Sequence, residues 1–143
     1  MTKIKPIKRF NFKHFHSITS RWMDNDIYGH INNVTYYSYF DTAVNHYLID
    51  AADFDIHKAS VVGYVVHSEC NYLSSIAFPD SIEVGLKVNR IGNSSVTYDL
   101  ALFKNGEAVA SAQGVFVQVF VDRKHGRPVT IPNFIRSALE LLC

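Results

Sequence analysis

The sequence predicts an α+β domain in which one antiparallel sheet curls around a single long apolar helix. Three observations predict this fold: three- and four-residue apolar steps over residues 33–50, alternation of apolar and polar residues in several later segments, and a two-residue turn signal between two of them. The chain has 143 residues, of which 48% are hydrophobic and 19% charged, as in one packed domain of ordinary size. We therefore expect a single domain over residues 1–143.

The chain before the helix contains one expected strand. Residues 15–19 are rich in aromatic and β-branched side chains, and the polar run 24–26 ends this segment. The helix follows Gly29, and Asn32 or Asn33 can serve as its N-cap. Further apolar side chains extend round the helix, at Tyr36, Tyr39, Ala43 and Ile49. A helix of this kind must be largely enclosed by protein.

The rest of the chain is mostly strand. Apolar alternation or β-branched enrichment predicts strands around residues 61–66, 82–88, 96–102 and 107–121. Asn105-Gly106 indicates a two-residue hairpin between the last two strands. Pro132 begins a short final helix, whose expected inward residues are Phe134, Ile135, Ala138, Leu139 and Leu142. We expect the open edge of this sheet to pair with a second copy, because unpaired strand edges promote association.

Composition and charge exclude several classes of function. The formal net charge of +1 argues against a polybasic surface for nucleic acid or anionic lipid. No segment approaches the ~20 apolar residues of a membrane span, and no apolar secretion signal follows the charged N-terminal residues. Cys70 and Cys143 lack the spacing of a zinc site or disulfide framework. We expect a cytoplasmic protein with no nucleic-acid or membrane partner, no metal and no cofactor.

The polar segment that contains potential chemistry lies between the first strand and the helix, over residues 24–33. A calcium loop is excluded, because Tyr28 occupies a ligand position and Thr35 stands where a bidentate Glu is required. The Asp and Asn side chains can instead cap the helix and form turns. They can also supply a catalytic carboxylate beside the electropositive helix end, as acyl transfer requires. The residue types alone favour capping and leave catalysis open.

The same segment resembles the signature of the 4-hydroxybenzoyl-CoA thioesterase-like family of hotdog-fold acyl-CoA thioesterases. The residues that carry this resemblance are Asp24-x-Asp26-x-x-Gly29-His30-x-Asn32-Asn33, followed by Tyr36 and Tyr39-Phe40-Asp41. The similarity continues through Val62-Gly63, residues 82–95, Asn105-Gly106 and residues 120–132, and so covers nearly the whole chain. The Gly-His-x-Asn-Asn part is typical of the broader branch that includes fatty acyl-CoA thioesterases, and it is absent from the hydroxybenzoyl-specific branch.

The resemblance implies a hotdog fold and the hydrolysis of an acyl-coenzyme A thioester to free acid and CoA. It assigns Asp26 as nucleophile or general base and the Gly63 amide as oxyanion donor, and it assigns Gly29, His30 and Asn33 to the loop around the acyl-thioester group. It also implies a substrate carried by CoA or by acyl carrier protein, and a homodimer that can pair further into a homotetramer. Beside it, the residue types make Tyr36 a candidate for an acyl pocket and Arg90 a candidate for the CoA phosphates.

Two other functions remain open. A hotdog dehydratase or hydratase would need a positioned histidine, for which His30 is available. A non-catalytic acyl-CoA binding protein would keep the same fold without turnover. The chain contains no Gly-x-Ser-x-Gly elbow, phosphate-binding glycine loop or H-E-x-x-H zinc helix.

Overall fold

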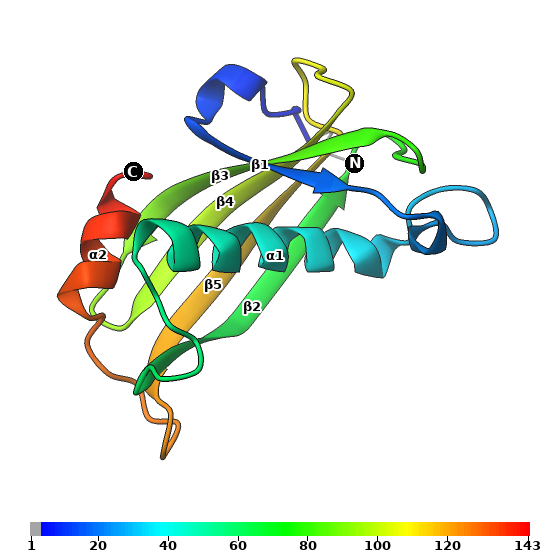
Figure 1. Ribbon diagram of the computed structural model, residues 1–143. Helices are drawn as coiled ribbons and strands as arrows, with labels where there is room; N and C mark the ends of the chain where they lie inside the picture. Colours follow the sequence, from blue (N-terminus) through cyan, green and yellow to red (C-terminus); the bar gives the residue numbers. More distant parts are fainter. Residues whose placement is uncertain (1–3) are drawn as a thin grey trace.

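The computed structural model describes residues 4–143, which form a five-stranded antiparallel sheet and a long helix that crosses one of its faces (Figure 1). The strand order is β1-β3-β4-β5-β2. The elements are η1 (Arg9–Asn11), β1 (His14–Thr19), η2 (Trp22–Asp24), α1 (Asn33–Ala51), β2 (Val61–Tyr72), β3 (Ser81–Ile91), β4 (Ser95–Lys104), β5 (Ala112–Asp122) and α2 (Asn133–Glu140). The α+β hotdog arrangement expected from the sequence is therefore confirmed.

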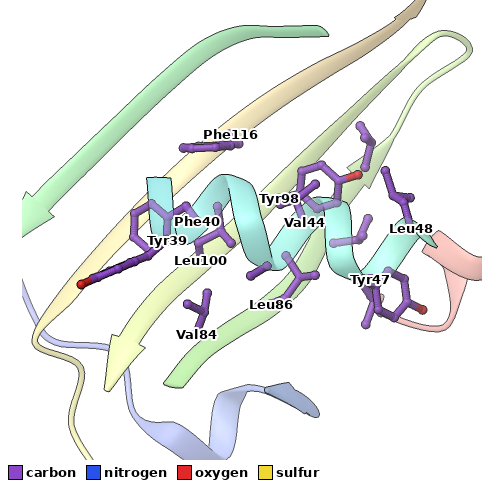
Figure 2. Packing of buried hydrophobic residues seen from close by; sticks show 14 of the residues in the cluster. Tyr39, Phe40, Val44, Tyr47, Leu48, Val84, Leu86, Tyr98, Leu100 and Phe116 are labelled. Atoms are coloured by element: carbon purple, nitrogen blue, oxygen red, sulfur yellow. The ribbon is translucent and has the colours of Figure 1, made fainter. Parts of the chain in front are cut away.

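The core lies between α1 and the inner face of the sheet (Figure 2). The helix contributes buried residues at three- and one-residue steps, namely Tyr36, Tyr39, Phe40, Ala43, Val44, Tyr47 and Leu48. Alternate residues of the central strands face them, including the fully buried Leu86, Tyr98 and Leu100. Each such large apolar side chain stabilises the fold by about 1.5–3 kcal/mol through burial. This packing holds α1, and with it the loop at its N-terminal end, in one position on the sheet.

Three of the sequence expectations are wrong in detail. The helix is enclosed on one side only, and Ile49 is 45% exposed. Phe134 of α2 is 52% exposed and does not point inward, although Ile135, Ala138, Leu139 and Leu142 are buried as expected. Strand β5 begins at Ala112 rather than near residue 107. Alternation predicts which residues share a face, but the elements that cover that face are set by contacts distant in the sequence.

The residues before β5 pair with the N-terminal segment. Asn105 and Gly106 both have positive φ angles, 53° and 70°, which confirms the predicted turn. The following residues then leave β4: the Ala110 amide donates to the Ile7 carbonyl at 2.9 Å, and the Arg9 amide donates to the Ala108 carbonyl at 2.8 Å. Phe12 packs with Ala101, Phe103 and Ala110 in a second, smaller cluster on the outer face of the sheet. No helix within residues 4–143 is both long enough and apolar enough to cross a membrane.

The two edges of the sheet differ in length. The edge strand β1 has 6 residues, whereas the other edge strand, β2, has 12 and runs on to Tyr72, beyond the expected segment. Gly63 lies opposite Phe120 of β5, whose amide donates to Ser94 and whose carbonyl accepts from Val129. The amide and the carbonyl of Phe120 therefore both point away from β2. In an antiparallel pair without hydrogen bonds between the two residues, the N–H and C=O of Gly63 likewise point away from β5, out from the free edge of the sheet. An open edge is confirmed, and its pairing with a second copy remains a prediction.

Candidate active site

The loop between β1 and α1 contains two carboxylates, and the first of them is structural. Asp24 is 3% exposed. Its Oδ2 accepts hydrogen bonds from the Tyr39 hydroxyl at 2.7 Å and from the Arg21 amide at 2.9 Å, while its Oδ1 lies 3.1 Å from the Arg21 guanidinium. Burial alone would raise the pKa of Asp24, but the hydrogen bonds from Tyr39 and Arg21 outweigh it and leave this pKa lowered.

Asp24 joins the loop to the helix at two points. Burial and the hydrogen bond to Asp24 raise the pKa of Tyr39, which keeps its hydroxyl protonated and able to donate. The Asp24 carbonyl also accepts from the Asn32 amide at 2.9 Å. The family signature contains Asp24 and Tyr39, but the sequence predicted Tyr39 only as part of the apolar helix surface and did not predict its hydrogen bond to Asp24. Their spacing of 15 residues gives no local signal of contact; only the fold brings them together.

The second carboxylate, Asp26, is half-buried and only partly engaged. Its Oδ1 accepts from the amides of Tyr28 at 2.9 Å and His30 at 3.3 Å. Its own amide donates to the His30 carbonyl at 2.8 Å, and Gly29 closes the turn with a φ angle of 84°. The Oδ2 of Asp26 has no hydrogen-bond partner within the described chain. One oxygen thus stabilises the turn, and the other is available to attack a carbon or to accept a proton.

The first turn of α1 presents an unpaired donor next to this loop. Asn32 is the N-cap, as one of the two sequence alternatives expected, and its Oδ1 accepts from the Val34 amide at 3.0 Å. The Asn33 amide has no acceptor in residues 4–143, although its carbonyl accepts from the Tyr72 hydroxyl at 3.2 Å. Free amides at a helix N-terminus carry partial positive charge and stabilise an anion there.

Two of the sequence candidates for substrate binding meet in a pocket of about 300 Å³. His30 and Tyr36 line it together with Tyr72 and residues 73–75. Tyr36 is buried, its ring packs edge-on against that of Tyr72 at a centroid distance of 4.9 Å, and burial raises its pKa. The structure therefore groups Gly29, His30, Asn33 and Tyr36 around the Asp26 loop, with Tyr72 as a neighbour that the sequence analysis missed.

Gly63 and Arg90 lie elsewhere in the same chain. Tyr72, which touches the helix start, is nine residues from Gly63 along β2, or roughly 30 Å at about 3.3 Å per residue. Arg90 pairs with Thr97 at that same distant end of the sheet and is exposed. Gly63 instead lines a groove of about 970 Å³ between β2 and α1. A single chain thus does not bring Gly63 or Arg90 to Asp26.

Comparison with known proteins identifies the class to which this fold and loop belong. The chain belongs to the thioesterase-like superfamily, whose family model matches residues 20–139. It is 54% identical to the PA5185 protein of Pseudomonas aeruginosa strain PAO1, whose crystal structure superposes with a TM-score of 0.95 over 96% of each chain.

Two further relatives cover most of the chain. A thioesterase from Thermus thermophilus, solved in complex with coenzyme A and Zn, is 29% identical, with 90% of this chain and 98% of that chain covered and a TM-score of 0.74. The uncharacterized protein YsmA of Bacillus subtilis strain 168 is 27% identical over 120 residues, which cover 84% of this chain and 80% of YsmA. The family and the hotdog fold inferred from the signature are thereby confirmed.

Proposed function

We propose that the protein hydrolyses acyl-coenzyme A thioesters to a free acid and CoA, with Asp26 as the reacting carboxylate. The observation that carries this proposal is the partial engagement of Asp26: one oxygen is held by loop amides, and the other has no partner in the described chain, in a loop that leads to the unpaired Asn33 amide at the helix start. Membership of the thioesterase-like superfamily supports the reaction class. Similarity to a thioesterase complexed with coenzyme A supports CoA as the thiol carrier.

Two chemical routes use this geometry. In the first, Asp26 Oδ2 attacks the thioester carbon, the C–S bond breaks to release CoA thiolate, and water then hydrolyses the mixed anhydride. In the second, Oδ2 takes a proton from a water molecule that attacks the same carbon, after which the C–S bond breaks and the CoA thiolate leaves and is protonated. Both routes place negative charge on the carbonyl oxygen, and main-chain N–H groups such as those of Asn33 and Gly63 are suited to stabilise that charge.

We further propose that the site is completed in a homodimer formed by antiparallel pairing of β2 with β2 of a second copy. Such pairing aligns the beginning of one β2 with the end of the other. Gly63 of the partner subunit then approaches the end that carries Tyr72 and the Asp26 loop, with its N–H directed out of the strand edge. The exposed apolar residues Val65 and Val66 of β2 support an interface here.

The same arrangement assigns a role to Arg90. This residue lies at the same end of the sheet as Gly63, three strands away across β5 and β4. A guanidinium at that distance suits the phosphates of CoA, which lie away from the thioester. Pairing of two such dimers into a tetramer is compatible with this placement of both residues.

The experiment that tests the hydrolase proposal is thiol release from a panel of acyl-CoA substrates by the Asp26→Asn variant. The amide keeps an oxygen for the Tyr28 and His30 amides but lacks a nucleophilic carboxylate. We expect kcat/KM to fall by about 10²–10⁴-fold with an unchanged melting temperature. Glu107→Gln is the matched control, because Glu107 is exposed and its side chain forms no hydrogen bond in the described structure.

The proposal is wrong if Asp26→Asn releases thiol at the parent rate. Loss of the conjugated absorbance of an enoyl-CoA, without thiol release, would favour the hydratase alternative. Tight binding of acyl-CoA without either reaction would favour a non-catalytic binding protein.

A further inference from the structure

A buried glutamine of β5 lies under the groove that Gly63 lines, and its amide group has a defined orientation. Gln118 is 2% exposed and lies opposite Val65 of β2. Its Oε1 accepts a hydrogen bond from the Tyr98 hydroxyl at 2.8 Å. Tyr98 is fully buried and donates to no other group in the described structure. Because a buried hydroxyl must donate to an acceptor, Tyr98 requires the oxygen of Gln118 on its side.

The nitrogen of the same amide consequently faces away from Tyr98. Nε2 lies so close to Gly63 that a Cβ atom at position 63 would clash with it. A larger residue at position 63 would displace the Gln118 side chain from this position. Nε2 has no acceptor among the described residues, and Gln118 lines the groove of about 970 Å³. An N–H donor on a buried side chain is therefore directed at the groove without a partner.

The surroundings of this donor are largely apolar. Phe116 and Val65 lie beside it in the groove, and the ring of Tyr37 stacks with that of Phe116 at a centroid distance of 6.3 Å. The polar groups Asp41 and Asn45 lie on the helix side and are hydrogen-bonded to each other at 3.2 Å. An alkyl chain laid over Gln118 would bury the N–H without an acceptor, which is unfavourable. An acyl group that carries an oxygen would satisfy it.

We propose that the Gln118 amide nitrogen donates a hydrogen bond to an oxygen on the acyl group, so that the protein selects acyl thioesters with an acceptor close to the thioester over unsubstituted alkyl thioesters. This inference rests on the proposed function, because it takes the thioester to lie near Gly63. Gln118 comes from the same subunit as Gly63 and therefore acts on a thioester that faces Asp26 of the partner subunit. The proximity of Nε2 to Gly63 limits the acceptor to the first few acyl carbons. Sites built to hydrogen-bond a substrate oxygen discriminate strongly against analogues that lack it.

The test compares 3-oxohexanoyl-CoA with hexanoyl-CoA, which differ only by the oxygen acceptor on the third acyl carbon. The variant is Gln118→Met in a Tyr98→Phe background, which removes the donor while leaving no buried hydroxyl without an acceptor. Tyr98→Phe alone shows the effect of the hydroxyl. Gln113→Met is the matched control, because Gln113 lies on the same strand, faces the outer side of the sheet and accepts from the Ile7 amide.

We expect the ratio of kcat/KM for the two substrates to be at least tenfold in the parent protein and in Gln113→Met. In the double variant we expect this ratio to fall to within about threefold, through loss of activity on the 3-oxo substrate alone. The difference in intrinsic reactivity of the two thioesters cancels when the ratios of two proteins are compared. A ratio that is unchanged in the double variant, or equal losses on both substrates, would overturn the inference.

A parallel binding measurement separates this inference from the hydrolase proposal. The dissociation constants of the two corresponding thioether analogues, which cannot be hydrolysed, are measured by calorimetry with the same proteins. A preference of the parent protein for the 3-oxo analogue that the double variant loses supports the role of Gln118 even where no thiol is released. Equal affinity of the parent protein for both analogues contradicts it. Gel filtration of each variant reports any change of oligomeric state.

Discussion

The two halves of the loop between β1 and α1 hold the same residue type in different surroundings. In the first half, Asp24 is buried and bonded through both carboxylate oxygens to Tyr39 and Arg21. In the second half, Asp26 lies two residues further on and has only one oxygen engaged. The difference teaches that burial and the number of hydrogen-bond donors, rather than the carboxylate itself, separate a structural group from one that is free to react.

The largest expected effect on stability comes from removing the buried carboxylate. Asp24→Ala leaves the Tyr39 hydroxyl buried without an acceptor and Arg21 without its partner, and we expect a loss of about 2–3 kcal/mol in the free energy of unfolding by urea. Tyr39→Phe removes only a donor and should cost about 1 kcal/mol. Asp26→Ala should cost less than Asp24→Ala, because Asp26 is half-buried and binds amides that water can reach. Equal losses at the two positions would show that the two carboxylates contribute equally to stability.

The helix cap next to the second half of the loop should have an intermediate effect. Asn32→Ala removes the acceptor for the Val34 amide and should lower the free energy of unfolding by about 1 kcal/mol. Asn32→Asp keeps an acceptor and adds a negative charge at the helix N-terminus, so it should restore the stability. If the Asp variant were as unstable as the Ala variant, the cap would contribute little and another interaction would position the loop. Chemical unfolding monitored by circular dichroism provides the measurement.

The smallest expected effect is a pH dependence of the free energy of unfolding. It arises from histidines near the C-terminal end of α1, opposite the loop. Burial, together with the neighbouring His46, lowers the pKa values of His14 and His16 below 6.5, although Asp50 partly opposes this for His14. The unfolded chain then binds more protons than the folded one, so stability should fall as the pH decreases from about 7 toward 5. His46→Gln should reduce this slope, measured from unfolding midpoints between pH 5 and 8.

Asp24 should produce a separate acid transition. The pKa of Asp24 is lowered in the folded state. Its contribution to the free energy of unfolding is therefore complete above the ordinary carboxyl pKa of 3.8 and is lost as the pH falls through the pKa of the folded state. Asp24→Asn should reduce the loss of stability in acid, to which Asp80 also contributes through its lowered pKa, and should leave the histidine slope unchanged. A variant that alters both transitions equally would indicate that the two ends of α1 unfold as one electrostatic unit.

Much of the fold follows from local patterns. The spacing of Tyr36, Phe40, Val44 and Leu48 predicts the buried face of α1, and Asn32 is a capping residue that begins the helix where expected. The turn at Asn105-Gly106 requires positive φ angles, which these residue types tolerate. These features depend on residues within a few positions of one another. The exposure of Ile49 and Phe134 was not predictable, because it depends on which elements lie over them.

For the site, the family signature singled out Asp26 but did not predict the structural role of Asp24. The signature residues from Asp24 to Asn33 indicated a polar loop at a helix start, and the structure groups His30 and Tyr36 beside it. The Asp24–Tyr39 hydrogen bond and the orientation of Gln118 by Tyr98 join residues 15 and 20 positions apart, and no local pattern encodes them.

The sequence by itself determined the periods of the helix and strands, the turn types and the family, because each of these depends on the residue types and their order along the chain. Tertiary structure decided which aspartate is buried, which amide remains unpaired and which end of β2 lies beside the helix start. The physical reason is that solvent exclusion and hydrogen-bond satisfaction are properties of the folded arrangement, in which donors and acceptors from distant segments meet.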